Sequence, residues 1–428
     1  MFVHWGLYSA AARREWVQQQ EQMNDDAYRR YFDRFDPDLY DPAAWAALAA
    51  AAGMRYVVLT AKHHEGFCLW DSALTDFKAT NTPAARDLLS PFVDAFRAHG
   101  LRVGLYYSLL DWHHPDFVID DLHPLRNAPD RDRLNEARVM ERYARYVHGQ
   151  VEELLTRYGD IDILWGDFTY DVDGPLGSIL SAVFAEMGGG PVKVGKSASD
   201  WRSEELLSLV RRLRPGILVN DRLGLDAGWD VTTSDSEQSI PSGWPLVGDE
   251  PALWETCQTF SGSWGYHRDE GSWKDVPQLL WMLIDTVSKG GNMLLNVGPT
   301  SRGALDGRAE DRLRGIAEWM RYHDRSIYGC TEAPAGITGP ADARLTYNPD
   351  GDRLYVHLLS WPNGRLDIAG FEGGISYAQL LNDGSEIRDM TFAEQLLSGG
   401  PTAEGAVALK LPGLRPDVAI PVVEVFLS

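Results

Sequence analysis

The chain has 428 residues, 44% of them hydrophobic, and a formal net charge of −22. This negative charge, with no basic stripe to offset it, argues against nucleic acid and anionic membranes as partners. No run of about 18 apolar residues predicts a membrane span, and three cysteines without CxxC spacing indicate neither a disulfide framework nor a zinc ribbon.

The chain opens on a short strand, Phe2-Val3, that passes directly into the loop residues His4 and Trp5. No signal peptide precedes it, so we expect a cytoplasmic protein. A first strand with nothing before it would leave one end of a barrel uncovered, and we therefore also expect a further segment upstream of Met1. The oligomeric state is left open, with a homo-oligomer as one expectation.

Strands and helices then alternate, joined by short loops. Helices are expected over residues 42–53, 90–100, 134–157, 204–213, 276–288 and 311–322, and strands over 56–61, 103–107, 161–167, 217–220, 253–257 and 293–297. This alternation is typical of a parallel sheet. With the first strand it gives seven strands, and an α/β fold, a (β/α)8-like barrel with one irregular element, is the simplest closure.

The pattern changes near residue 329. Short alternating segments at 353–359, 364–368, 377–381, 406–411 and 422–426 are separated by turns, and one helix is expected over 392–397. Such a series predicts a small antiparallel β-sandwich. We therefore expect two domains, a catalytic barrel over residues 1–332 and a C-terminal β-sandwich over 333–428.

Polar and aromatic residues stand at the ends of most predicted barrel strands. They are His4 and Trp5, His63 and His64, Tyr106 and Tyr107, Trp165 and Asp167, Asn220 to Arg222, Trp254 and Glu255, and Asn296. The active site of an α/β barrel forms at the C-terminal ends of its strands. So many such endings together predict a catalytic face.

Two chemistries compete for that face. The histidine pairs 63–64 and 113–114 suggest a metal, but no HxH or HExxH spacing is present, and neighbouring strand residues point to opposite faces unless the chain bends. Two carboxylates on different strands, Asp167 and Glu255, suit glycoside hydrolysis, in which one acid attacks and the other donates a proton. Glu237, Asp249 or Glu250 are alternative proton donors, and Asp167 alone would also suit a turn cap.

Several motifs support the second interpretation, glycoside hydrolysis by two carboxylates. They are His4-Trp5-Gly6-Leu7-Tyr8-Ser9, Glu15-Trp16, the segment 56–72 with Lys62-His63-His64-Glu65-Gly66, Asn220-Asp221-Arg222, Trp254-Glu255-Thr256-Cys257, Ser263-Trp264-Gly265-Tyr266 and Asn292 to Pro299. In this order they resemble the α-L-fucosidases of glycoside hydrolase family 29 over residues 1 to about 330.

The resemblance implies a retaining, exo-acting α-L-fucosidase that needs no metal and no organic cofactor and takes α-L-fucosylated oligosaccharides or glycoconjugates. Asp167, two residues after Trp165, aligns with the nucleophile, and Glu255 with the general acid/base. Residues that align with substrate contacts, or flank them, are His4, Glu15, Trp16, His63, His64, Tyr107, Trp165, Arg222 and Trp264. The stretch from Phe168 to about Asp200 departs from the family pattern. A fucose-binding, lectin-like protein without turnover is the alternative from another class.

Overall fold

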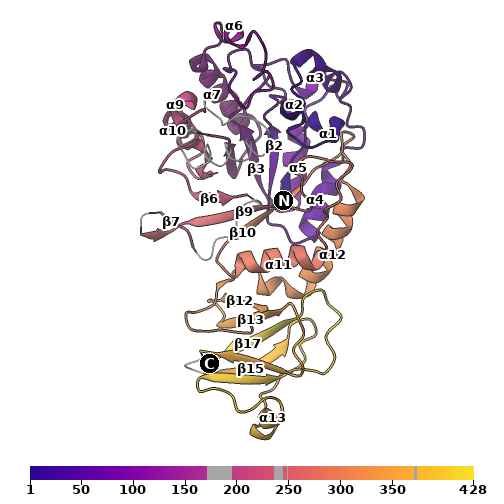
Figure 1. Cartoon of the computed structure of the whole chain (residues 1–428), viewed down its shortest axis with the longest axis vertical. Helices are drawn as coiled ribbons and strands as arrows, with labels where there is room; N and C mark the ends of the chain where they lie inside the picture. Colours follow the sequence, from indigo (N-terminus) through magenta and orange to yellow (C-terminus); the bar gives the residue numbers. More distant parts are fainter. Residues whose placement is uncertain (171–194, 236–243, 248, 371–373) are drawn as a thin grey trace.

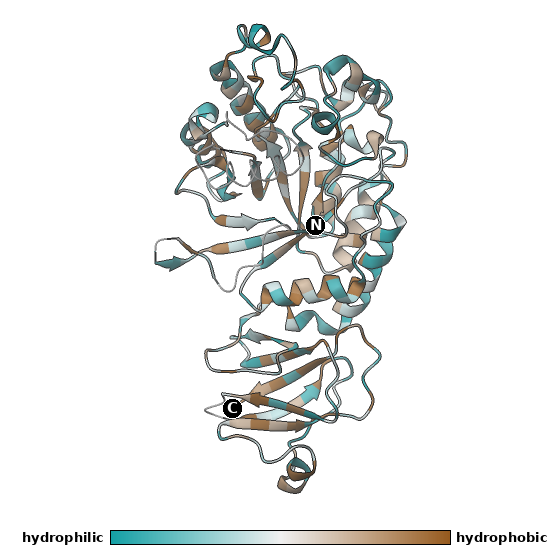
Figure 2. Cartoon of the chain, in the orientation of Figure 1, coloured by the Kyte–Doolittle hydropathy of each residue, from teal (hydrophilic) through white to brown (hydrophobic). Residues whose placement is uncertain are grey.

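The computed structural model describes residues 1–170, 195–235, 244–247, 249–370 and 374–428. Figure 1 shows a barrel built from the first three quarters of the chain and a separate stack of antiparallel strands below it. Helices α11 (Val276–Val287) and α12 (Gly307–His323) lie between the two parts. Figure 2 shows apolar residues gathered along the strands of both parts.

Eight parallel strands form the barrel sheet. They are β1 (Phe2–Val3), β2 (Tyr56–Lys62), β3 (Arg102–Ser108), β4 (Ile163–Asp167), β5 (Leu218–Val219), β6 (Val231–Ser234), β9 (Leu253–Thr259) and β10 (Asn292–Val297). Their order is β5-β4-β3-β2-β1-β10-β9-β6, and a parallel bridge between Asn220 and Val231 joins the two edges. The predicted barrel is confirmed as a nearly closed one, with β6 as the eighth strand that the sequence did not reveal.

Most strand connections carry the expected helices. Before α11, the expected helices are α4 (Pro42–Ala51), α5 (Leu89–Ala98), α7 (Met140–Arg157) and α10 (Ser203–Leu213). The described residues of this part also hold helices that were not expected, α1 (Tyr8–Ala11), α2 (Val17–Gln20), α3 (Asp25–Phe32), α6 (Arg131–Asn135) and α9 (Ala198–Trp201). Asp41 caps α4 as predicted, because its side chain accepts a hydrogen bond from Ala44 N at 3.0 Å. The helix expected from residue 134 begins instead at Met140, after the separate turn of α6.

The barrel is irregular between β5 and β9. Residues 220–230, all of them described, hold a single 3-10 turn, η2 (Asp221–Leu223), in place of an α-helix. The described part of the next connection carries a two-stranded hairpin, β7 (Leu246–Val247) and β8 (Glu250–Pro251). This region explains why the sequence pattern indicated only seven strands, since a strand of four residues is too short to show a clear periodicity.

The inside of the barrel is filled by one apolar layer. Its members alternate along the strands, as inward-facing residues must, and they are Phe2, Val58, Tyr106, Ile163, Trp165, Cys257 and Leu294. Ile163 and Trp165 of β4 both belong to this layer, whereas Ile161, which strand alternation would place on the same face, lies before the strand and packs in the main core cluster. Asp167 follows Trp165 by two residues, so its carboxylate points to the same interior, one layer nearer the C-terminal ends of the strands.

The C-terminal strands form antiparallel sheets, as expected. One has the order β11-β12-β13-β17-β15, and the other pairs β14 with β16. Their bounds are β11 (Thr331–Glu332), β12 (Ala343–Asn348), β13 (Arg353–Leu358), β14 (Arg365–Ala369), β15 (Ile375–Leu380), β16 (Ala406–Lys410) and β17 (Val422–Leu427), with α13 at Phe392–Leu397 and the turns η1 (Ala79–Asn81) and η3 (Asp324–Ser326) elsewhere.

The sandwich packs on the barrel through both apolar and polar contacts, since Tyr355, Ile420 and Val422 belong to the main core cluster. Arg344 pairs with Asp285 of α11 at 2.5 Å, and Trp319 of α12 donates a hydrogen bond to Ile420 O at 2.8 Å. The domain boundary at residues 332 and 333 stays a prediction. Within the described residues, no helix has the length and apolar character needed to cross a bilayer.

Candidate active site

Asp167 is the last residue of β4 and is buried at the C-terminal end of the barrel. Tyr106, on the neighbouring strand, donates a hydrogen bond of 2.7 Å to Oδ2, and Arg222 places Nη1 3.1 Å from Oδ1. Burial raises the pKa of Asp167 above its ordinary value, and the charge of Asp235 adds to the rise, while Arg222 and Tyr106 oppose it. Both carboxylate oxygens thus have a donor that stabilises the ionised form.

Arg222 is held by three partners. It stands in η2, directly after β5, where its Nε donates to Thr233 Oγ1 at 2.7 Å and its Nη2 to Asp235 Oδ1 at 2.7 Å. The guanidinium also lies 4.7 Å above the ring of Trp165. A structural pair with the adjacent Asp221 is not formed, because the Asp221 carboxylate accepts from Thr232 and Thr233 instead. Arg222 is therefore aimed at Asp167 by the short strand β6.

Three buried histidines line a pocket of about 430 Å³ together with Asp167. His4 Nδ1 is 2.6 Å from Asn296 Oδ1, and His64 Nδ1 is 2.7 Å from Ser108 Oγ. Burial lowers the pKa of His4 to about 4 and those of His63 and His64 well below their ordinary value. All three are therefore neutral near pH 7, and each ring offers one donor and one acceptor.

His63 and His64 both line the pocket, although they are adjacent in sequence. The β2–β3 register shifts between Thr60 and Lys62, and β2 ends at Lys62. The strand alternation that would send the two side chains apart therefore no longer applies. His63 Nδ1 is buried without a hydrogen-bond partner among the described residues, so it is free to bind a polar group of a ligand.

Aromatic rings close the sides of the pocket. Trp264 packs against His4 with ring centroids 5.3 Å apart, and Trp16 and Phe168 lie against His64 at 4.9 Å each. Glu15 lines the same pocket and accepts a hydrogen bond from Gly265 N at 2.8 Å. The predicted residues His4, Glu15, Trp16, His63, His64, Trp165, Asp167, Arg222 and Trp264 are thus brought together.

Tyr107 is not among them, because the structure turns its side chain away from this pocket, and its role in substrate binding stays a prediction. Its hydroxyl donates to Gln150 Oε1 of α7 at 2.8 Å, and its ring lies 4.4 Å from Lys62 Nζ, on the outer side of the barrel. Tyr106 lines the pocket in its place. The reason is strand alternation: Tyr106 has the same inward orientation as Trp165, with which it is paired in register, so Tyr107 must point outwards.

Glu255 is not brought to the pocket either. It is the third residue of β9, four residues or about 13 Å of strand before Thr259. Its Oε1 accepts a hydrogen bond from Trp165 Nε1 at 3.1 Å, and its Oε2 accepts one from Tyr56, the first residue of β2. The predicted strand ended at residue 257, which placed Glu255 too near the C-terminal face. The carboxyl lies one layer below Asp167, behind the indole of Trp165.

The alternative proton donors are spread over the β6–β9 connection. Asp249 and Glu250 are exposed in or next to the β7–β8 hairpin, and Glu237 falls outside the described residues. Asp235, which the sequence did not single out, lines the pocket. Within the described part of the chain, no group of three or more His, Cys, Asp or Glu side chains has the geometry to hold a metal ion.

The structure adds four pocket residues to those predicted: Phe2, Tyr106, Phe168 and Asp235. Phe2 and Tyr106 could have been found from the alternation of β1 and β3. Asp235 follows a strand that the sequence did not reveal. Phe168 has a positive φ of 78°. Its place in the pocket could not be predicted, because no sequence pattern indicates this unfavourable backbone conformation for a phenylalanine.

Comparison with known proteins shows the family of this chain. The family model described as alpha-L-fucosidase matches residues 1–325. The chain belongs to the α-L-fucosidase family, glycoside hydrolase family 29. Membership makes it a glycoside hydrolase and confirms the resemblance drawn from the motifs.

Individual α-L-fucosidases agree with this assignment. The chain is 30% identical to plasma alpha-L-fucosidase of Rattus norvegicus, over 93% of this chain and 84% of that protein. Alpha-L-fucosidase isoenzyme 1 from Paenibacillus thiaminolyticus has a similar structure, with a TM-score of 0.87, 39% identity and coverage of 100% and 96%. Thermotoga maritima alpha-fucosidase, solved with a mechanism-based inhibitor, gives a TM-score of 0.74, 27% identity and coverage of 99% and 94%.

Proposed function

We propose that this enzyme releases terminal α-L-fucose from fucosylated glycans or glycosides with retention of configuration, and that Asp167 is its nucleophile. The observation that carries the proposal is the position of Asp167, buried at the end of β4 between Arg222 and Tyr106, in a pocket that three neutral histidines also line. A carboxylate with a hydrogen-bond donor on each oxygen, in a polar pocket of a barrel, suits the attack on an anomeric carbon in a retaining glycosidase.

In the first step an Asp167 oxygen bonds to the anomeric carbon while the bond to the glycosidic oxygen breaks and an acid protonates the leaving group. In the second step the same acid takes a proton from water, which displaces Asp167. Arg222 and Tyr106 donate hydrogen bonds to the free carboxylate of Asp167. When the ester forms, the carboxylate loses its negative charge and these hydrogen bonds become weaker. Their donors therefore favour Asp167 as the leaving group of the second step.

The histidines and the aromatic walls suit the proposed sugar. Neutral imidazoles donate to and accept from hydroxyl groups, and His63 Nδ1 has a free position for one. Fucose carries a methyl group at C5 where many hexoses carry a hydroxymethyl, and rings such as Trp264 and Phe2 offer an apolar surface for it. A hydroxymethyl would leave its hydroxyl unpaired against them, at a cost of about 1–3 kcal/mol.

Glu255 as the proton donor stays a prediction, and the geometry does not support it. A general acid must come within about 3 Å of the oxygen it protonates, whereas Glu255 is bonded to Trp165 and Tyr56 below the pocket. We propose instead that Glu255 fixes the indole of Trp165, and that the proton comes from an acid of the β6–β9 connection. The cytoplasmic location and homo-oligomeric assembly also stay predictions.

Hydrolysis of 4-nitrophenyl α-L-fucoside between pH 4 and pH 8 tests the function. We expect release of 4-nitrophenol, with α-L-fucose as the first anomer detected by proton NMR, and no loss of activity in a chelator. No release above background at any pH would refute the fucosidase proposal. The β anomer as first product would refute retention, and inactivation by the chelator would favour the metal-dependent alternative.

A further inference from the structure

Phe168 follows the proposed nucleophile directly and has a backbone conformation that phenylalanine rarely adopts. Its φ is 78°, in the left-handed region where a side chain other than that of glycine is disfavoured. Strained residues persist only where the surroundings hold them, and they gather at functional sites. Neighbouring residues must therefore hold Phe168 in this conformation, and its ring is a candidate for a functional contact.

The ring of Phe168 is part of the pocket wall. It is partly buried, lines the same cavity as Asp167, and lies with its centroid 4.9 Å from that of His64 and 5.3 Å from that of Trp16. A carbon attacked by Asp167 stands about 3–3.5 Å from its carboxylate. Because the Phe168 ring lines the same pocket and packs against His64 and Trp16, it belongs to the wall beside which a sugar bound for that attack would lie.

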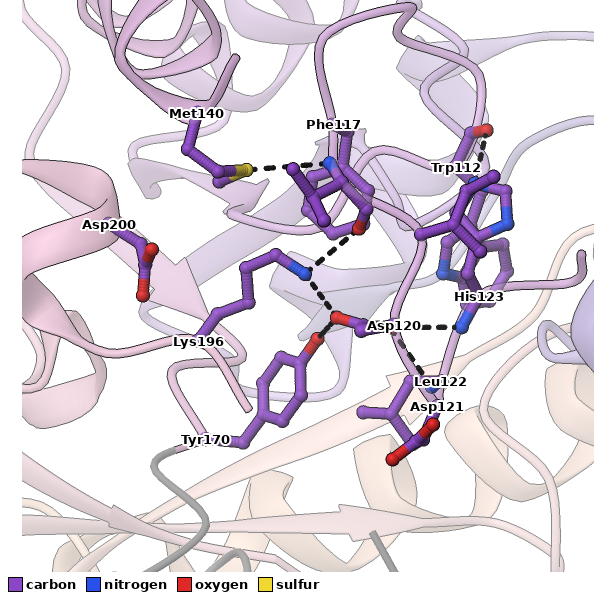
Figure 3. A network of polar contacts seen from close by, with 12 residues as sticks. Trp112, Phe117, Asp120, Asp121, Leu122, His123, Met140, Tyr170, Lys196 and Asp200 are labelled. Atoms are coloured by element: carbon purple, nitrogen blue, oxygen red, sulfur yellow. Dashed lines mark hydrogen bonds and ion pairs between the residues drawn. The ribbon is translucent and has the colours of Figure 1, made fainter. Parts of the chain in front are cut away.

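A buried ionic cluster holds the chain just after Phe168. Tyr170 and Lys196 are joined by two backbone hydrogen bonds of 2.9 Å each, one in each direction. Figure 3 shows both side chains pointing at the carboxylate of Asp120. The Tyr170 hydroxyl donates to Asp120 Oδ2, and Lys196 Nζ bonds to the same oxygen and to Val118 O at 3.1 Å.

The cluster is fully inside the protein. Asp120 and Tyr170 are 0% exposed and Lys196 is 3% exposed. Asp120 is fixed in turn by the backbone N–H groups of Leu122 and His123, at 3.0 and 3.1 Å. On the other side of Phe168, the Asp167 carbonyl accepts from Leu109 N at 2.9 Å. Phe168 is therefore clamped between the end of β4 and Tyr170.

We propose that Phe168 is a substrate-binding residue that contacts the fucosyl ring itself, and that Asp120, Tyr170 and Lys196 are positioning residues that hold it there. The proposal rests on the fucosidase function. Sugar rings pack their C–H groups against aromatic rings, and the pair Trp16 and Phe168 supplies such a wall beside His64. The strained backbone is the means by which the residue after the nucleophile turns its ring into the pocket.

Inhibition by free L-fucose, which has no leaving group, tests the contact. Phe168→Ala and Phe168→Gly should both raise the inhibition constant of L-fucose about tenfold. Phe392→Ala, which removes the same side chain from the exposed helix α13, should leave it unchanged. Because glycine accepts a positive φ, Phe168→Gly should melt at a higher temperature than Phe168→Ala while binding L-fucose equally poorly.

Two substrates then distinguish a contact of Phe168 with the sugar from a contact with the leaving group. Phe168→Ala should lower kcat/KM by a similar factor for 4-nitrophenyl α-L-fucoside and for α-L-fucosyl fluoride, whose leaving group is a single atom. A loss confined to the nitrophenyl substrate would place the ring against the leaving group and overturn the proposal, as would an unchanged inhibition constant. If the wild-type enzyme neither binds L-fucose nor hydrolyses either substrate, the fucosidase function itself fails.

A double-mutant cycle tests the clamp. Tyr170→Phe removes the hydroxyl donor to Asp120 and should raise the inhibition constant of L-fucose about threefold in the wild-type background. In the Phe168→Ala background the same change should have no effect, because the ring that the clamp positions is gone. An equal effect in both backgrounds would show that Tyr170 acts elsewhere and would overturn the positioning role.

Discussion

The hydroxyl of Tyr106 donates a hydrogen bond of 2.7 Å to Oδ2 of Asp167 from the neighbouring strand. The two strands are paired in register, with Tyr106 opposite Trp165 and Ser108 opposite Asp167. The bond is one of the influences that lower the pKa of Asp167 against the effect of burial. Tyr106 thus tunes the proposed nucleophile, although the resemblance pointed to its neighbour Tyr107.

Tyr106→Phe should lower kcat/KM about tenfold to a hundredfold, because a hydrogen bond to a charged group is lost. Removal of this donor also raises the pKa of Asp167, so the acidic limb of the pH–rate profile should move to higher pH. Tyr107→Phe is the matched control on the outer face of the same strand, and it should change neither quantity. A larger effect at Tyr107 would contradict the orientation of β3.

Asp167→Gly should abolish nearly all turnover of 4-nitrophenyl α-L-fucoside, by a factor on the order of 10³ or more. Added azide should restore part of the activity by attacking the anomeric carbon from the vacated side, with β-L-fucosyl azide as the product. Mass spectrometry and NMR of the product provide the measurement. Near-normal turnover in this variant would exclude Asp167 as the nucleophile.

Glu255→Gln separates the two roles considered for that acid. Glutamine still accepts the hydrogen bond from Trp165 Nε1, so we expect a loss of about tenfold or less, equal for 4-nitrophenyl and methyl α-L-fucosides. Glu255→Leu, which cannot accept it, should lose more on both substrates. A proton donor would behave differently, with a far greater loss on the methyl glycoside, whose leaving group needs protonation.

Asp235→Asn should shift the acidic limb of kcat/KM to lower pH. The negative charge of Asp235 raises the pKa of Asp167, so its removal favours the ionised form that attacks. The exposed Asp226, in the loop between β5 and β6, gives a control variant, Asp226→Asn, with no expected shift. A limb displaced to higher pH would mean that Arg222 no longer reaches Asp167 once its second partner is lost.

Glu65 should make stability depend on pH. Burial raises its pKa to about 8, although Tyr28 and the backbone around Leu7 donate to it. The folded state therefore holds a proton that the unfolded state releases above about pH 4.3. This contribution is complete below that pH and is lost as the pH rises towards 8. Urea titrations of Glu65→Gln should show a smaller fall in unfolding free energy between pH 5 and pH 8 than the wild type.

The sequence by itself determined the barrel, the sandwich, the family and most of the pocket. Alternating strands and helices carry their periodicity locally, and the motifs that hold His4, His63, His64 and Arg222 are contiguous. Ile163 and Trp165 lie in one layer inside the barrel, as strand alternation requires. A turn cap alone does not account for Asp167, because its side chain lines the pocket.

The tertiary structure decided what depends on register and on contacts between distant segments. The extra two residues of β9 moved Glu255 below the pocket, and the pairing of β3 with β4 exchanged Tyr107 for Tyr106. The strand β6, four residues long, brought Asp235 to Arg222. Phe168 owes its place to a buried cluster of Asp120, Tyr170 and Lys196, residues up to 76 positions apart. A one-residue change of register turns a side chain to the other face, and no local pattern fixes the register.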